Sequence, residues 1–479
     1  MASIEKELFR EELAKRQQVI AEAKIPVIVI LEGWGTAGKG SAIKSMIKYM
    51  DPRYYRVYNM DVMSEDEKRR PFLYRHAIRM PKQGQFSIYD GGLMDETVTA
   101  YLMKDISKAE YKRRIDSTVK YERQLRDNGY LVLKFFLDID KKTQSQRIDR
   151  LMDKKNSKWR VSAKDVWQNI NYDEYKKQFD KYIKKTDTVE APWHIISGDD
   201  MDTVERYVAT TIVSAIDAAV ANPWKAKILD NKYPMVDFKG LSSIPLAGKS
   251  LTEEEYGKKL KSLQKKLSKL GDKLYKKGVP LIIAYEGWDA AGKGGNIKRV
   301  ASALDPRDFE VHPIASPTPD EKNRHFLWRF YNRLPKTGHT AIFDRTWYGR
   351  VMVERLEGFC SENDWQRAYN EMNEFEKDLT DWGAIVIKFW VQIDKDTQLE
   401  RFNDRQNTPS KMWKITDEDW RNREKWDLYE TAVNEMIKKT NTQFAPWYIL
   451  ESVDKKYARI KALEIIIDRV ESVIGDDSI

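Results

Sequence analysis

The chain has 479 residues, of which 41% are hydrophobic and 33% are charged. This balance is typical of a well-solvated globular protein, and it excludes a disordered or membrane-embedded chain. The length is too great for one ordinary core and fits two domains of about 200 residues each, while the formal net charge of +9 favours a polyanionic partner without identifying it.

The cysteine content and the lengths of the apolar runs indicate where in the cell the protein is expected. Cys360 is the single cysteine, so an intramolecular disulfide and a multi-cysteine metal site are both excluded. The N-terminus is charged and amphipathic, and the apolar runs Ile25–Leu31 and Val279–Tyr285 are too short to span a bilayer. We therefore expect a cytoplasmic protein whose partners include neither a membrane nor a nucleic acid.

An internal repeat organises the sequence. LEGWGTAGKGSAIK, beginning at Leu31, returns as YEGWDAAGKGGNIK, beginning at Tyr285, at a shift of 254 residues (285 − 31). The shift then holds without a gap. Further matched pairs are Arg75 with Arg329, Arg79 with Arg333, Asp90 with Asp344, Arg147 with Arg401 and Trp159 with Trp413. Such sustained register indicates a tandem duplication.

The two repeats predict two domains of one fold. We place the domains at residues 1–222 and 251–479, and we read the proline-containing segment 223–250 as the linker between them. Within each repeat the pattern is helix, buried strand, glycine loop, helix, and then further strands separated by helical stretches. This order predicts an α/β fold in which helices flank a mostly parallel sheet.

The second repeat opens with a lysine-rich stretch, Tyr256–Lys277, whose leucines recur at helical spacing. We favour a helix that packs on its own domain over a coiled-coil partner helix. Short apolar runs bounded by polar or turn residues then predict strands buried on both faces. These runs are Leu281–Tyr285, Thr340–Phe343, Ala384–Trp390 and Trp447–Glu451.

A glycine loop follows the first of these strands and precedes a predicted helix. Such a loop lets successive backbone N–H groups face anionic oxygens, while the helix N-terminus and a lysine add positive charge. The strand, the spacing, the lysine and the second copy favour phosphate binding over a plain strand-to-helix connection. The predicted phosphate-binding residues are Gly287, Ala290, Ala291, Gly292, Lys293 and Gly294, with Lys298 on the following helix.

The loop departs from the usual P-loop at Gly294, where Ser or Thr normally places a hydroxyl on Mg²⁺. Another oxygen ligand is then required. Asp289 in the loop and Asp344 at the end of the 340–343 strand are the candidates, because Mg²⁺ favours carboxylates and retained waters. Helix capping is the competing role for such an aspartate. The two aspartates together favour a metal site, for Mg²⁺ or alternatively Mn²⁺.

Charged residues follow Asp344 at close spacing. Arg345 would lie where negative charge develops on a phosphoryl group in transfer, a role that suits a planar guanidinium. Arg350 and Glu354 are further candidates for substrate binding, although a solvated charged helix would look similar.

Two other basic sets extend this picture. Arg329, Arg333 and Lys336 form a row that suits a long anionic chain as well as it suits solvent. Arg401 and Arg405 lie one helical turn apart, so both could project from one face of a mobile lid. For isolated charges of this kind a surface position is the more common role.

These motifs resemble the polyphosphate kinase 2 family. The resemblance rests on EGWDAAGKGG, on FDRTWYGR with VERLEGF, on a KxWK lid motif at 411–414, and on the APWY ending. It covers nearly the whole chain, twice. The tandem arrangement and GRVMVERLEGF are most similar to the two-domain members of the polyphosphate:AMP phosphotransferase type.

The resemblance implies tandem P-loop kinase-like domains with a helical lid. It also implies reversible, Mg²⁺-dependent transfer of a phosphoryl group from inorganic polyphosphate to AMP, giving ADP. On matching positions it assigns phosphate binding to 287–294 with Lys293 and metal binding to Asp289 and Asp344. The resemblance assigns the stabilisation of transition-state charge to Arg345. It assigns the role of the lid arginine to Arg401 or Arg405.

The first repeat departs from this pattern where the chemistry would lie. Gly35, Gly91, Glu96, Ala100 and Leu151 stand at the positions of Asp289, Arg345, Arg350, Glu354 and Arg405. Lys39, Asp90 and Arg147 are retained. We therefore predict that the first domain is degenerate, with a structural or polymer-docking role, and that the second domain is catalytic.

Two alternatives stay open at this point. An ATP-dependent nucleoside monophosphate kinase would share the loop, the lid and the metal. A non-catalytic nucleotide- or polyphosphate-binding protein is conceivable, although it has no need of the full set Asp289, Lys293, Asp344 and Arg345. The sequence also leaves open the preferred acceptor, the favoured direction and association into a homo-oligomer.

Overall fold

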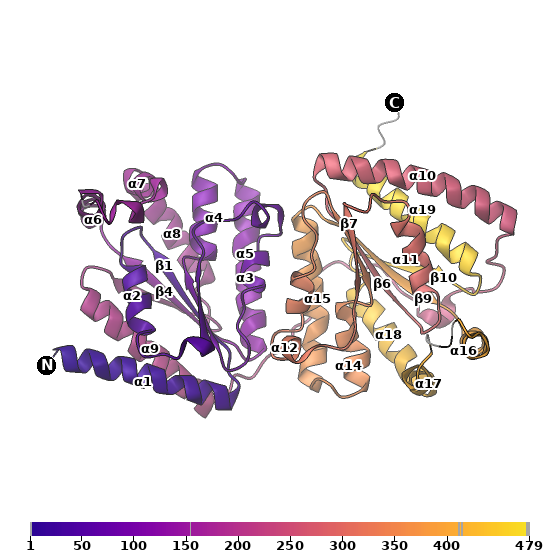
Figure 1. The fold of residues 1–479 in the computed structure, drawn as a ribbon, viewed down its shortest axis with the longest axis horizontal. Helices are drawn as coiled ribbons and strands as arrows, with labels where there is room; N and C mark the ends of the chain where they lie inside the picture. The colour runs from indigo at the N-terminus through magenta and orange to yellow at the C-terminus, as the bar shows by residue number, and fades with distance from the viewer. Residues whose placement is uncertain (1, 154, 411, 413–414, 476–479) are drawn as a thin grey trace. The chain divides into compact units, whose positions relative to one another are not determined.

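The computed structural model describes residues 2–153, 155–410, 412 and 415–475. The chain divides into two compact units (Figure 1). Unit 1 comprises Met1–Lys68, Arg75–Lys227 and Thr318–Trp328, and unit 2 comprises Arg69–Tyr74, Ile228–Pro317 and Arg329–Ile479. Each unit therefore includes one short segment from the other repeat.

Each unit is built on a five-stranded parallel sheet. In unit 1 the strand order is β2-β3-β1-β4-β5, with β1 Val27–Gly33, β2 Tyr55–Asn59, β3 Phe86–Asp90, β4 Leu131–Asp138 and β5 Trp193–Ser197. In unit 2 the order is β7-β8-β6-β9-β10, with β6 Leu281–Gly287, β7 Phe309–Pro313, β8 Thr340–Asp344, β9 Ile385–Gln392 and β10 Trp447–Glu451. The two sheets thus share one topology, and the predicted α/β fold is confirmed.

The helices recur in the same order in both repeats. Those of the first repeat are α1 Ala2–Ala23, α2 Lys39–Met46, α3 Tyr74–Ala77, α4 Leu93–Leu102, α5 Lys108–Asp127, α6 Lys141–Asp153, α7 Ala163–Ile170, α8 Tyr172–Thr186 and α9 Met201–Ala221. Those after the linker are α10 Glu253–Lys277, α11 Lys293–Ala301, α12 Pro319–Lys322, α13 Trp328–Tyr331, α14 Val353–Leu356, α15 Glu362–Asp381, α16 Lys395–Asn407, α17 Asp417–Glu424, α18 Trp426–Thr440 and α19 Lys455–Ile474.

Helices cover both faces of each sheet, as Figure 1 shows for α11 and α19 on one face of unit 2 and α15 and α18 on the other. The lysine-rich helix α10 packs along α19 and buries Leu267, Leu270 and Leu274, so the prediction of packing within its own domain is confirmed. None of the described helices is long and apolar enough to cross a membrane.

The central strands carry a buried charge at matched positions. Lys388, in the middle of β9, is fully buried, pairs with Glu376 at 2.8 Å and donates to the Thr440 carbonyl at 2.7 Å. In unit 1, Lys134 pairs with Glu122 at 2.7 Å. A buried charge is stable only when it is paired and hydrogen-bonded, so this pair belongs to the shared scaffold of both units.

Candidate active site

The glycine loop lies at the carboxyl edge of the unit 2 sheet, where β6 ends and α11 begins. Gly287 has φ +154°, and a Cβ at this position would lie 2.6 Å from the Val391 carbonyl oxygen. Gly292 has φ +113° and is the N-cap of α11. Glycine is therefore required at both ends of the loop, and the turn aims the N-terminus of α11 at the edge of the sheet where an anion would bind.

Lys293, the first residue of α11, folds back over the loop. Its Nζ donates to the carbonyl oxygens of Gly287 at 2.7 Å and Trp288 at 3.2 Å. In unit 1, Lys39 makes the matched contacts to Gly33 and Trp34 at 3.2 and 3.0 Å. The lysine position is therefore common to both repeats, and the differences between them lie elsewhere.

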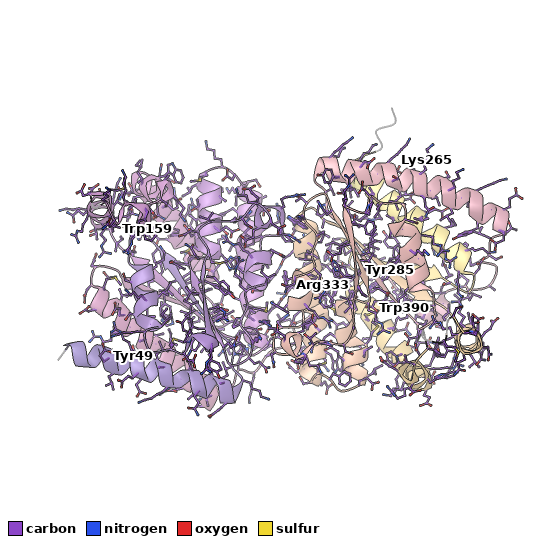
Figure 2. The ribbon with its side chains drawn as sticks, viewed as in Figure 1. Tyr49, Trp159, Lys265, Tyr285, Arg333 and Trp390 are labelled. Atoms are coloured by element: carbon purple, nitrogen blue, oxygen red, sulfur yellow. The ribbon has the colours of Figure 1, made fainter. Side chains whose placement is uncertain are left out.

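The loop is also anchored through an aromatic stack. Trp288 stacks on Trp426 at 3.7 Å between ring centroids, and its Nε1 donates to Gln392 at 3.0 Å. Figure 2 labels Trp390 on β9, which meets Trp288 edge-on at 5.6 Å. In unit 1 the stack is formed by Trp34 and Tyr172 at 4.0 Å. These contacts fix the loop on α18 in unit 2 and on α8 in unit 1.

Arg401 lies behind the loop. It is buried, and its guanidinium donates to the carbonyl oxygens of Ala290 and Ala291, both at 3.0 Å, of Ser452 at 2.5 Å and of Val453 at 3.1 Å. In unit 1, Arg147 contacts the four matched carbonyls. The structure thus gives Arg401 a positioning role on the loop backbone, which was not predicted.

Of the predicted lid residues, Arg405 lies one turn farther along α16 and is partly exposed. Lys411, Trp413 and Lys414 of the predicted lid motif lie outside the described residues. The next helix, α17 (Asp417–Glu424), carries Asn422 towards the loop, and we call α17 the lid helix of unit 2. Its counterpart in unit 1 at the 254-residue shift is α7 (Ala163–Ile170).

The loop aspartate joins the loop to the lid helix. One Asp289 carboxylate oxygen accepts from Asn422 at 3.0 Å, and the other lies 3.4 Å from the Arg345 guanidinium. Gln398 donates to the Asp289 carbonyl at 3.1 Å. Asp289 and Arg345, predicted independently from the sequence, are therefore brought together, whereas Asn422 and Gln398 were not predicted.

Arg345 has a left-handed backbone, with φ +66°. The matched residue of unit 1 is Gly91, with φ +83°. Left-handed conformations cost an L-residue about 1 kcal/mol or more, so unit 2 retains a strained arginine where unit 1 has the residue that relieves the strain. Partial burial lowers the pKa of Arg345, but the charges of Asp289, Glu286 and Glu418 outweigh it and raise the pKa above its ordinary value.

Asp344 ends β8 directly beside β6. It lies opposite Tyr285, labelled in Figure 2, in the parallel register, and the Arg345 N–H donates to the Tyr285 carbonyl at 3.0 Å. Because the carboxyl ends of parallel strands share one edge, Asp344 and the loop lie at the same edge of the sheet. The predicted site therefore assembles from β6, β8, α11 and α17.

The carboxylates at this edge of the sheet are the candidate ligands of the predicted metal. Among the described residues, no group of three or more His, Cys, Asp or Glu side chains is arranged to hold a metal ion. Mg²⁺ commonly uses only one or two carboxylates, with waters and substrate phosphates completing its octahedron. Asp289 and Asp344 supply two carboxylates at one edge of the sheet, and metal binding there stays a prediction.

Glu286 was not among the residues predicted from the sequence. This buried residue precedes Gly287, and one carboxylate oxygen accepts from both the N–H and the hydroxyl of Thr346 at 2.7 Å. It thereby fixes the turn that carries Arg345. In unit 1, Glu32 accepts from the N–H groups of Met94 and Asp95 at 3.0 and 3.3 Å. The recurrence of EGW in both repeats was the available signal.

Glu32 leads to a pH prediction. Burial raises its pKa to about 8 from 4.5, so the folded chain keeps a proton that the unfolded chain releases. Its contribution to stability is complete below pH 4.5 and is lost as the pH rises to about 8. Relative to Glu32→Gln, the free energy of unfolding of the wild type should fall by about 3 kcal/mol between pH 5.5 and 8.5. Urea unfolding of the wild type and of Glu32→Gln across this pH range measures the effect. A difference in the free energy of unfolding between the two proteins that does not change with pH would contradict the prediction.

The remaining predicted site residues make other contacts. Arg350 pairs with Glu354 at 3.1 Å, with 18% of each side chain exposed. Arg329 is buried and donates to the Ala315 carbonyl at 2.8 Å, and Arg333, labelled in Figure 2, donates to the Arg329 carbonyl. Lys336 is partly exposed, and Gly294 and Lys298 are exposed on α11. Their roles towards a substrate stay predictions.

Comparison with known proteins agrees with the fold and the repeat. The family model described as polyphosphate kinase 2 matches residues 2–223 and again 250–476. A crystal structure assigned to polyphosphate kinase 2 from Pseudomonas aeruginosa superposes with a TM-score of 0.86 at 37% identity, covering 100% of this chain and 97% of that one.

Two curated relatives are similar over nearly their full length. The polyphosphate:AMP phosphotransferase of Pseudomonas aeruginosa is 39% identical over 478 residues, which cover 98% of this chain and 95% of the relative. The polyphosphate:AMP phosphotransferase of Acinetobacter johnsonii is 36% identical over 448 residues, which cover 93% of this chain and 91% of the relative. In both comparisons the aligned region spans both repeats of this chain.

Proposed function

Because the chain belongs to the polyphosphate kinase 2 family, we propose that it is an enzyme that transfers the terminal phosphoryl group of inorganic polyphosphate to AMP, giving ADP. The observation that carries this proposal is the assembly in unit 2 of Lys293, Asp289, Arg345 and Asp344 around one glycine loop. Full-length similarity to two polyphosphate:AMP phosphotransferases supports polyphosphate as donor and AMP as acceptor.

The reaction needs positioning and charge neutralisation more than covalent chemistry. An oxygen of the AMP phosphate attacks the terminal phosphorus of polyphosphate, and the bond from that phosphorus to the shortened chain breaks. The backbone N–H groups of the loop and the Lys293 ammonium bind phosphate oxygens, while Arg345 neutralises charge that develops on the transferred group. No phosphoenzyme is required.

The chain's own residues hold this arrangement in place. Arg401 binds the carbonyl oxygens of Ala290 and Ala291 and so holds the backbone of the loop in place. Glu286 fixes the turn that carries Arg345. Asp289 and Asp344 would hold Mg²⁺ or Mn²⁺, which when bound neutralises phosphate charge.

Reversibility forms part of the proposal. One phosphoanhydride bond breaks in polyphosphate and one forms in ADP, so the two sides are chemically similar and substrate concentrations set the direction. A cytoplasmic location and association into a homo-oligomer stay predictions.

The deciding experiment incubates the purified full chain with Mg²⁺, AMP and either polyphosphate or ATP, and separates the nucleotides by charge. We expect ADP from AMP and polyphosphate. ADP formed only with ATP would identify an ATP-dependent monophosphate kinase instead. Binding without turnover of either donor would leave a nonenzymatic binder and would overturn the proposal.

A further inference from the structure

The lid helix of unit 1 is tied to the body of its unit by a lysine. The Lys164 ammonium on α7 lies 2.6 Å from Asp95, in the first turn of α4, and 3.1 Å from Asp61, just after β2. Only 25% of the Lys164 side chain and 13% of the Asp95 side chain are exposed. One ammonium therefore bridges two separate elements of unit 1 to the lid helix.

The same helix fills the place of the missing loop aspartate. A Cβ built on Gly35 would lie 2.1 Å from a carboxylate oxygen of Asp165. Gln168, also on α7, accepts from the Gly35 N–H at 2.7 Å, and Gln144 donates to both Gln168 and the Gly35 carbonyl. The space that the Asp289 side chain takes in unit 2 is thus occupied in unit 1 by the lid helix itself.

The charges at matched positions differ between the units. Asp61, Asp95 and Lys164 of unit 1 correspond to Ala315, Gly349 and Glu418 of unit 2. At these positions the lid helix of unit 2 carries the negative Glu418 and the body carries no charge. In unit 1 the lid helix carries the positive Lys164 and the body carries the carboxylates of Asp61 and Asp95.

The Lys164 charge also acts on the aspartate that corresponds to Asp344. Burial raises the pKa of Asp90, and the charges of Lys39 and Lys164 oppose that rise. A Cβ at Gly91 would lie 3.4 Å from the Asp61 carboxylate, so Asp61 and its lysine partner lie close to the position that corresponds to Arg345. Lys164 therefore offsets part of the negative charge at this edge of unit 1.

We propose that Lys164 holds the lid helix α7 closed over the loop of unit 1, and that this unit consequently binds no Mg²⁺–phosphate ligand. The inference rests on contacts within unit 1 and does not require the proposed function.

Hydrogen exchange of the full chain, followed by mass spectrometry, tests the proposal. In the wild type, Mg²⁺ with sodium tripolyphosphate should leave amide exchange in α7 unchanged. Lys164→Ala should speed exchange in α7 about tenfold, because a partly buried double ion pair is lost. Exchange in α17 should stay as in the wild type. Lys164→Arg, which keeps the charge, is the matched control and should exchange as slowly as the wild type.

A charge exchange separates the ion pair from general effects on the helix. Lys164→Asp combined with Asp95→Lys should restore slow exchange in α7, and failure to do so would overturn the proposal. Slower α7 exchange on adding tripolyphosphate to the wild type would also overturn it. If tripolyphosphate did not change amide exchange in α17, that result would count against the proposed function alone. The exchange rate of α7 is measured independently of the exchange rate of α17.

Discussion

Lys293→Ala is expected to lower the formation of ADP from AMP and polyphosphate by about 10³-fold. The Lys293 ammonium is held 2.7 Å from the Gly287 carbonyl, beside the N-terminus of α11. It is the full positive charge that the loop presents to phosphate, so its loss removes both binding and transition-state stabilisation. Initial rates over a range of polyphosphate concentrations separate the two effects.

Lys39→Ala is the matched control, because Lys39 makes the same contacts to its own loop. Its turnover should stay close to that of the wild type. Asp344→Asn should lose activity to a similar degree as Lys293→Ala, whereas Asp90→Asn should not. Equal losses for the two lysine variants would refute the assignment of catalysis to unit 2.

Arg345→Gly should abolish most turnover, by about 10³-fold or more, without loss of stability. The substitution places in unit 2 the residue that unit 1 has at Gly91. Relief of left-handed strain, about 1 kcal/mol, offsets the greater freedom of glycine in the unfolded chain. The free energy of unfolding, measured in urea, should therefore stay within about 1 kcal/mol of the wild type.

Arg345→Lys supplies the comparison for this variant. It keeps the positive charge but loses the planar, bidentate guanidinium, so we expect turnover between those of the wild type and Arg345→Gly. If Arg345→Gly kept wild-type turnover, the arginine would have no part in transfer, and the retained strain would have another cause.

Periodicity and the repeat were sufficient to predict most of the fold. The four predicted strands of the second repeat correspond to β6, β8, β9 and β10, and the apolar runs of β6, β8 and β9 are almost entirely buried. The exception is β7, Phe309–Pro313, an edge strand in which only His312 is buried. A strand that buries so little apolar surface gives a weaker sequence signal.

The site was predictable only where a residue's role follows from its local motif. The loop, Lys293 and the aspartates carry such a signal. Asn422 does not, since its contact with Asp289 joins positions 133 residues apart. Arg401 recurs as Arg147, and recurrence in a degenerate copy was evidence for a structural role. The orientation of the Arg401 guanidinium towards the loop carbonyls depends on tertiary packing, which residue spacing alone does not predict.

The stacked indoles of Trp288 and Trp426 give unit 2 an intrinsic optical reporter. Two indoles in van der Waals contact couple their ultraviolet transitions, and the resulting circular dichroism depends on how the transition dipoles of the two rings are oriented; the ring planes here are 10° apart. The matched pair in unit 1 joins an indole to a phenol, whose transitions differ in energy and couple less. Because Trp288 lies in the loop and Trp426 begins the helix after the lid helix, a change in this band would follow loop movement during turnover without any added label.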